Sequence, residues 1–540
     1  MLLVASPALL VTPAGAQTGA WTPTAPVSSA QVLGTPSGVP LGAPLGGALP
    51  TAAPPGGAPA SFWSASVSLQ ETATNNVDLN PSATAKTALV TEITPMLTLN
   101  HSGSRINLAG TISLPVVLNL PSGAGTDRVY PAVNLYGDIA LVNNFLYVEG
   151  AVNVSQQFFS PFGAQPSSLA NTTQNRYRAD SYRVSPYIRG VTQASTSYEL
   201  RNDNIWTNLS GTPISTNNST YTSFSGVASN VQTTLGWQAS FNYTDTRINT
   251  QDSVSTQIYR GSPIYAVDPN LRLSASGGYE QNRGSATSSQ GAIYGVGFAW
   301  HPTPRTNLTG DWEKRFFGSS YRFSYDHVTP LSVWNLRLSR NISSYPVQLA
   351  TLPAGVSVPG FLDSLFLFGI PDPADRQRVV DQFIRDRGLP STLSSPVNLY
   401  TEQILLQQYV GATVGLIGAR NTIFVTAYSV RNEPIAASGT PLPPILATGN
   451  NNTQNGANVV WTYRLTPSIA FVASADGFQT LSNQGLVANT KQGIVRMALS
   501  TTLTPMTTAF AGARYQVLQS DVALDYTEVA IFAGIGYTFR

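Results

Sequence analysis

Cysteine is absent from this 540-residue chain, and histidine occurs only three times. Without cysteine there are no disulfides, thiolate metal sites or cysteine nucleophiles. Charged residues make up 10% of the sequence, far below the roughly 25% of an average soluble domain. The net charge of +2 gives no electrostatic basis for binding nucleic acid, so we expect no nucleic-acid partner.

Long hydrophobic runs are also missing. No stretch after the N-terminus approaches the roughly 18 continuous apolar residues of a transmembrane helix, which excludes a helical membrane protein. Ser, Thr, Asn, Gln and Gly take the place of the missing charge, and aromatic residues reach 10%. A polar but uncharged chain suits a protein that meets lipid on one face and water on the other.

The first sixty residues read as processing and linker segments. An apolar run from Leu2 to Val11 precedes Ala14-Gly15-Ala16, an A-x-A-type cleavage site. We therefore predict a secretory signal peptide over 1–16, the alternative being an apolar, unstructured N-terminus. Residues 17–60 are rich in Pro, Gly and Ala and bury too little apolar surface to offset ordering entropy, which predicts a disordered tether.

From residue 61 onward, apolar and polar residues alternate with a period of two. The pattern is clearest in four segments: Leu235–Tyr243, Leu271–Glu280, Tyr321–Asp326 and Trp334–Ser339. In the first, Leu235, Trp237 and Tyr243 belong to the apolar set. This period places the two sets on opposite faces of a sheet.

Alternation alone also fits a soluble β-sandwich, but three features favour a membrane barrel. The segments run about 9–12 residues, the length of a tilted strand that crosses a bilayer, and they recur along nearly the whole chain. Aromatic residues also cluster near segment ends, as in interfacial girdles. These are Tyr243, Trp300, Trp312, Trp461, Tyr463, Tyr537 and Phe539.

Turn chemistry predicts the orientation. A Thr-Pro pair recurs between strands, beginning at Thr303, Thr329, Thr466 and Thr504. Proline fixes φ for a tight turn and cannot donate to a central ladder, so these pairs mark reversals. The other strand ends are longer, as in Phe158–Asp180 and Asn432–Asn458. Short turns lie in the periplasm and long loops lie outside in such barrels.

These signals predict an all-β, transmembrane, antiparallel up-and-down barrel over 61–540 in a Gram-negative outer membrane. We count about 22 strands, with a range of 16–22 because the pairs near Asn217–Ser229 and Ser253–Arg260 are weakly patterned. The final segment, Val529–Arg540, resembles the C-terminal strand that barrel assembly machinery recognises, although Arg540 follows the usual terminal aromatic. Outer-membrane lipid and that machinery are the expected partners.

One helical insertion, 341–401, interrupts the strand pattern. Asp372 followed by Pro373 resembles a helix N-cap with proline at the first position, and Gly388 followed by Pro390 ends the helix. An apolar segment, Phe361–Phe368, comes before it. The insertion is either an outer-side loop or a plug in the lumen, and with the tether it is one of two candidate plugs.

Several stretches resemble a family of outer-membrane barrels found with the PEP-CTERM/exosortase system, commonly beside exopolysaccharide genes. The matching stretches are Tyr182–Gly190, Tyr198–Arg201, Phe368–Arg376, Arg387–Pro390, Leu399–Glu402 and Gly418–Asn421. The resemblance implies an uncharacterised barrel linked to export or anchoring of surface polysaccharide or sorted proteins. It implies no catalytic residue.

Catalysis has little support in the sequence. His101, His301 and His327 lie apart, in or beside predicted periplasmic turns, and no motif supplies an oriented partner. No His, Asp or Glu cluster has metal-ligand spacing, so we expect no metal and no cofactor.

The predicted polar face carries charges of both signs, which fits either a neutral solute such as a sugar or salt bridges that stiffen the wall. We predict a channel or an envelope component for surface polysaccharide or protein export. The alternatives are a structural or adhesive protein with a closed lumen and, third, an outer-membrane enzyme. The predicted lumen or plug contacts are Asp375, Arg376, Arg378, Asp381 and Arg385 in the insertion, and Arg272, Glu280, Arg322, Asp326 and Arg337 on the wall.

Overall fold

The computed structural model describes residues 62–120, 128–192, 196–210, 218–230, 234–248, 253–284, 288–350, 358–366, 376, 379–380, 393, 404–435, 451–483 and 488–539. The predicted signal peptide and tether lie outside these residues. Among the described residues, no helix is both long and apolar enough to cross a membrane.

Strands make up almost all of the described chain. The first half contains β1 (Phe62–Thr74), β2 (Ala88–Ser102), β3 (Ile106–Ser113), β4 (Val116–Leu120), β5 (Arg128–Val129), β6 (Ala132–Val142), β7 (Leu146–Phe158), β8 (Arg176–Val191), β9 (Ser197–Ser210), β10 (Asn218–Asn230), β11 (Leu235–Ile248), β12 (Val254–Asp268) and β13 (Leu271–Arg283).

The second half contains β14 (Ser289–Thr303), β15 (Thr306–Arg315), β16 (Gly318–Val328), β17 (Ser332–Ser343), α2 (Tyr345–Ala350), α3 (Val358–Phe366), β18 (Leu405–Ile417), β19 (Asn421–Pro434), β20 (Asn452–Arg464), β21 (Ile469–Ser482), β22 (Asn489–Thr504), β23 (Thr507–Ser520) and β24 (Tyr526–Phe539).

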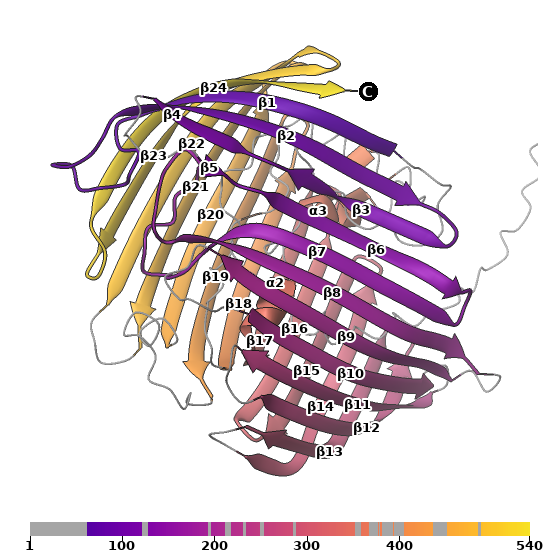
Figure 1. Cartoon of the computed structure of the whole chain (residues 1–540). Helices are drawn as coiled ribbons and strands as arrows, with labels where there is room; N and C mark the ends of the chain where they lie inside the picture. Colours follow the sequence, from indigo (N-terminus) through magenta and orange to yellow (C-terminus); the bar gives the residue numbers. More distant parts are fainter. Residues whose placement is uncertain are drawn as a thin grey trace, which may run out of the picture.

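The strands form one closed antiparallel barrel. Outside β3–β6, each strand pairs with its neighbour in the sequence, and β1 also pairs with β24 (Figure 1). In that last pair, Ala65 is opposite Phe539. Both β3 and β4 pair with β2, while β5 pairs with β4 and β6 with β3, so these are two interrupted strands. The 24 strand segments are therefore 22 strands. The predicted barrel is confirmed, and the weakly patterned pairs form complete strands, β10 and β12.

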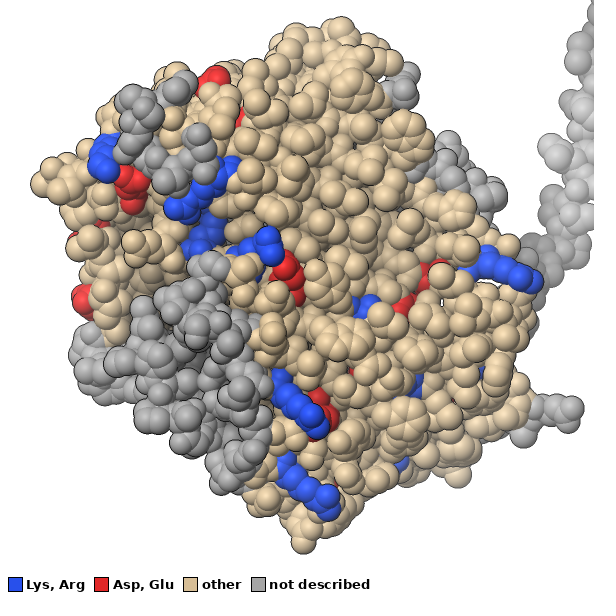
Figure 2. Space-filling view, in the orientation of Figure 1, with Lys and Arg blue, Asp and Glu red and all other residues tan. Residues whose placement is uncertain are grey.

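The alternating faces of the strands separate lipid from lumen. In β11, Leu235 and Trp237 are exposed on the outside, whereas Gly236 between them is buried. Uncharged residues cover most of the surface seen in Figure 2, where charged side chains are sparse. The outer wall therefore presents the apolar band that a bilayer requires.

Exposed aromatic residues form belts at both ends of the barrel. Trp237, Trp300, Trp334, Trp461 and Tyr537 lie near the short turns. The second belt lies toward the long loops and contains Trp206, Tyr243, Tyr259, Tyr294 and Trp312. Amphipathic rings prefer the two membrane interfaces, so the belts mark the span of the bilayer.

Short and long connections lie at opposite ends. Turns such as 304–305 and 505–506 join one set of strand ends, while 159–175 and 344–404 join the other. By the rule that short turns are periplasmic, the ends of the described chain, Phe62 and Phe539, lie on the periplasmic side. The three histidines lie at that same end, in or beside β2, β14 and β16.

Candidate functional site

The insertion leaves the wall at the outer end of β17 and contacts the wall again at β8–β10. Helix α2 begins two residues after β17 and lies against β8, β9 and β10. The Tyr345 hydroxyl is hydrogen-bonded to the Tyr177 hydroxyl, and Val347 packs with Ile205 and Tyr221 in a buried apolar cluster. Both helices lie between the front and back walls in Figure 1. The start of the insertion therefore lies inside the barrel mouth.

Farther along the insertion, α3 packs on the inner wall near the periplasmic end. Val358 and Leu362 of α3 are fully buried, with Val380 and Leu393 in the same cluster. On the wall, that cluster includes Val333, Ile417, Phe424 and Val460, each within five residues of a short turn. These four side chains face inward, because Trp334, Leu416, Val425 and Trp461 beside them are exposed outside.

The insertion thus contacts the lumen wall at both ends of the barrel. The apolar segment noted in the sequence, Phe361–Phe368, overlaps α3, and its register buries Leu362 and Leu365. Of the helix predicted at Asp372–Arg387, Arg376, Val379 and Val380 are helical, and the other positions lie outside the described residues.

Several wall residues predicted to contact the insertion pair within the wall. The Arg315 Nη2 lies 2.6 Å from Glu280 Oε1, and Arg337 Nη2 lies 2.8 Å from Asp326 Oδ1. Arg322 lies 4.0 Å from Asp311. Arg272 is on the inner face of β13. These ion pairs connect strands, which is the stiffening role that a mixed-charge lumen allows.

In the insertion, Arg376 pairs with Asp363 of α3, with Nε 2.6 Å from Oδ1. This bond joins two parts of the insertion and holds the chain after α3 against the helix. Asp375, Arg378, Asp381 and Arg385 lie outside the described residues, so their pairing stays a prediction.

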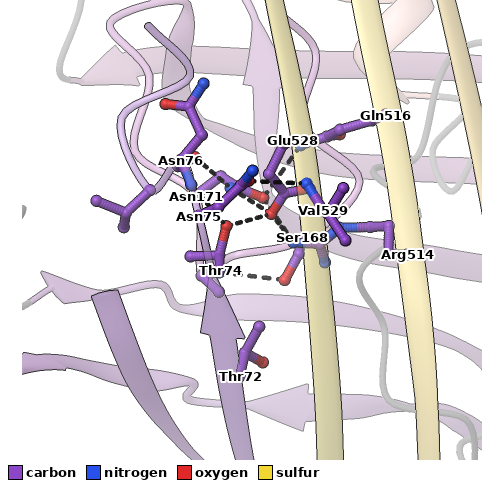
Figure 3. A network of polar contacts seen from close by, with 12 residues as sticks. Thr72, Thr74, Asn75, Asn76, Ser168, Asn171, Arg514, Gln516, Glu528 and Val529 are labelled. Carbon is purple, nitrogen blue, oxygen red and sulfur yellow. Dashed lines mark hydrogen bonds and ion pairs between the residues drawn. The ribbon is translucent and has the colours of Figure 1, made fainter. Parts of the chain in front are cut away.

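A second segment, 159–175 between β7 and β8, also folds into the lumen. Asn171 is fully buried, and its Nδ2 donates to Glu528 Oε1 at 3.1 Å, while Arg514 Nη2 donates to Asn171 Oδ1 at 2.9 Å (Figure 3). Gln492 Nε2 donates to the Gln165 carbonyl at 2.8 Å. The segment is thereby bonded to β22, β23 and β24.

This second infolded segment differs from the sequence-based prediction, which placed Phe158–Asp180 among the long outer loops. Its polar residues, including Ser168 and Asn171, look like those of a solvated loop. The wall partners of Asn171, Arg514 and Glu528, are more than 300 positions away in the sequence. The expectation of only two candidate plugs was therefore wrong, since the described residues supply another.

A cavity of about 530 Å³, lined by both polar and apolar side chains, remains beside the inner faces of β9–β17. Residues at the two ends of the insertion, Ser344, Val347 and Ile404, line it together with the wall. Small hydroxyl side chains are prominent on the wall: Ser225, Ser240, Ser262, Ser274, Ser276 and Ser320. The cavity thus joins the insertion to a hydroxyl-rich face of the lumen.

Charges in this cavity balance. Its lining includes three arginines, Arg260, Arg315 and Arg322, and three carboxylates, Glu199, Asp311 and Glu313. The Arg260–Glu313 pair is bidentate, with distances of 2.8 and 2.9 Å. Paired charges of both signs give no net preference for an ion of one sign, whereas hydroxyl groups bind neutral polar solutes.

The histidines do not join this cavity. His327 accepts or donates a 2.8 Å hydrogen bond with Thr306 and stacks on Tyr325 at the periplasmic rim. His101 and His301 lie near the periplasmic ends of β2 and β14. The described part of the chain has no group of three or more His, Cys, Asp or Glu that could hold a metal ion.

Neither the family models nor the curated proteins searched give a match to this sequence. Among solved structures, the FrpB iron transporter from Neisseria meningitidis has 7% identity and a TM-score of 0.46, covering 88% of this chain and 82% of its own. The siderophore receptor PirA from Acinetobacter baumannii has 8% identity and a TM-score of 0.46, covering 89% and 81%. The outer membrane protein opdK from Pseudomonas aeruginosa has 7% identity and a TM-score of 0.32, covering 88% and 99%.

With its 22 strands, aromatic belts and apolar outer face, the protein is an outer-membrane β-barrel.

Proposed function

We propose that this protein is an outer-membrane channel for neutral, hydroxyl-rich solutes, with a lumen restricted by the insertion between β17 and β18. The observation that carries the proposal is the cavity beside β9–β17, where three arginines and three carboxylates balance among serine hydroxyls. A barrel of about 22 strands leaves a lumen wide enough to need a plug, and the insertion contacts the wall at both ends of it.

The solute we favour is surface polysaccharide, or a fragment of it, moving outward. The sequence resemblance to exosortase-associated barrels supports this assignment, as does the chemistry of the cavity. Sugar hydroxyls donate and accept hydrogen bonds as serine and threonine do, and they carry no charge that a balanced lining would repel.

Single-channel recording in planar bilayers tests the proposal. We expect discrete conductance with a cation-to-anion permeability ratio near one, and concentration-dependent block by neutral oligosaccharides but not by simple salts of similar size. A strongly ion-selective pore, or conductance insensitive to oligosaccharides, would contradict the proposed solute.

A structural or adhesive protein with a closed lumen is the second candidate. The buried bonds of segment 159–175 favour it, because Asn171, Arg514 and Glu528 are each at most 5% exposed and hold that segment inside the lumen. Absence of conductance from protein that is demonstrably folded would favour this second candidate over the channel.

A further inference from the structure

Basic side chains on the lipid face gather at one end of the barrel. Arg178, Arg247 and Arg431 are there, each within four residues of the outer end of its strand. Each pairs with an acid two positions away on the same strand: Asp180 at 3.0 Å, Asp245 at 3.2 Å and Glu433 at 2.6 Å.

Four more lipid-facing cations lie at the same level without such an acid. They are Arg283, Lys314, Arg340 and Lys491, again within four residues of the outer strand ends. Within the part of the chain that the structure describes, no carboxylate lies at ion-pair distance from them. In a membrane, these cations require an anionic partner from outside the chain or direct contact with water.

The periplasmic half of the lipid face is different. Among the described strands, no Lys or Arg faces lipid there, although both interfaces have aromatic residues, such as Trp237 and Trp300 on the periplasmic side. If the outer cations only needed water, the two interfaces would be equivalent. Their asymmetry indicates a partner found in one leaflet.

Two of the cations lie close together beside the hairpin of β15 and β16. Lys314 is paired in register with Ser319, and Arg340 Nη1 donates a hydrogen bond to the Ser319 carbonyl oxygen. Lys314 and Arg340 therefore lie on either side of the outer end of β16. The gap between them, on the lipid face, is one strand wide.

The same hairpin offers an apolar surface. Phe316 is 39% exposed and packs edge-on against Phe317 at 5.2 Å, while the Arg340 guanidinium carbon lies 5.7 Å from the Phe317 ring centre. Gly318, with φ of 102°, permits the tight turn that brings these rings together at the rim. Nearer the membrane centre, Trp312 lies two residues from Lys314 on the same face and is 37% exposed. An acyl chain can therefore lie on Trp312 while its headgroup lies between the two cations.

We propose that Lys314 and Arg340 bind a phosphate group of a polyanionic phosphoglycolipid in the outer leaflet, with Trp312 contacting its acyl chain. The site lies on the outside of the barrel, so it is independent of the channel function. Lys and Arg beside a membrane surface each strengthen binding of anionic lipid about fivefold, so loss of both weakens it about 30-fold.

Native mass spectrometry of the full-length protein, released from detergent with added lipid A, measures this binding. We expect bound lipid A on the wild type and about 30-fold weaker binding for the double variant Lys314→Gln/Arg340→Gln. Arg105→Gln/Arg420→Gln removes the same charge from exposed periplasmic turns and should bind as the wild type does. Heat-modifiable gel migration confirms that each variant is folded.

Three results would overturn the proposal. One is equal loss of lipid A from the two double variants, which would make the effect one of net charge. Another is binding of phosphatidylcholine to the wild type as strongly as lipid A, because the site would then not distinguish an anionic lipid from one without net charge. The third is displacement of bound lipid A by inorganic phosphate added at the same concentration, which would show that the site binds a free anion. If Lys314→Gln/Arg340→Gln does not fold, Lys314→Gln alone should show a loss of about fivefold.

Discussion

Arg514 and Glu528 form an ion pair on the lumen wall, with Nη2 2.7 Å from Oε1, and the side chains are 4% and 0% exposed. Asn171, from a segment more than 300 residues away in the sequence, bonds to both of them. Thr74 Oγ1 donates to the same carboxylate at 2.7 Å. One carboxylate therefore joins β1, β23, β24 and segment 159–175, next to the seam where the barrel closes.

Replacing Glu528 with alanine should strongly destabilise the barrel. The change leaves the buried Arg514 guanidinium without its counter-charge, which costs about 3–5 kcal/mol in comparable buried pairs. Urea unfolding in lipid vesicles measures the difference. The double variant Arg514→Met/Glu528→Leu removes both charges and should recover part of the loss. A Glu528→Ala variant as stable as the wild type would show that the pair contributes nothing.

Deleting Gly355–Pro390 should leave a folded barrel with a larger conductance and make cells more sensitive to bulky antibiotics. The deletion removes α3 and its contacts with the inner wall, while the wall keeps all its strand pairs. Planar-bilayer recording and growth on antibiotic plates measure the two effects. If the shortened protein folds but its conductance is unchanged, the insertion does not restrict the pore. The structural or adhesive function is then better supported than the channel.

Neighbouring residues on β19 provide a matched test of α3 docking. Phe424 is fully buried against the α3 cluster, whereas Val425 beside it is 41% exposed on the lipid face. Phe424→Ala should loosen the docked helix, since such a truncation costs about 3–5 kcal/mol in a packed core, and should raise the frequency of conductance fluctuations. Val425→Ala should leave the recordings unchanged. If Phe424→Ala and Val425→Ala changed the recordings equally, the change would come from the barrel wall and not from α3 docking.

Arg260→Ala should make the pore cation-selective. The cavity lining would change from three arginines and three carboxylates to two arginines and three carboxylates, and Glu313 would lose its bidentate partner. Reversal potentials in a salt gradient report the change. Arg420→Ala removes a cation from a periplasmic turn, outside the cavity, and serves as the control. An unshifted reversal potential for Arg260→Ala means that ions do not pass through this cavity.

Cysteines placed at Gly439 and Ser468 should differ in their reaction with an impermeant thiol reagent on intact cells. Ser468 lies in the short turn between β20 and β21, and Gly439 lies between β19 and β20, outside the described residues. Gly439→Cys should react and Ser468→Cys should not. The native chain has no cysteine to interfere. The reverse labelling pattern would show that the short turns face the cell exterior and the long loops face the periplasm.

The sequence by itself determined the wall of this protein. A period of two fixes which side chains face lipid, and strand length together with turn chemistry fixes the number of crossings, because these are local properties of consecutive residues. That is why Trp300 and Trp461 could be assigned to interfacial belts from the sequence, and why the count of 22 strands agrees with the structure.

Only the tertiary structure decided what occupies the lumen. Asn171 meets Glu528 and Leu362 meets Phe424 because closing the barrel brings inner faces together across a distance that no sequence period encodes. The pairing of Glu280 with Arg315 could not be predicted from the sequence for the same reason. Any arginine in the lumen could pair with Glu280 by charge, and the register of the strands decides which one lies within reach. The wall follows from local periodicity, whereas the contents of the lumen follow from closure.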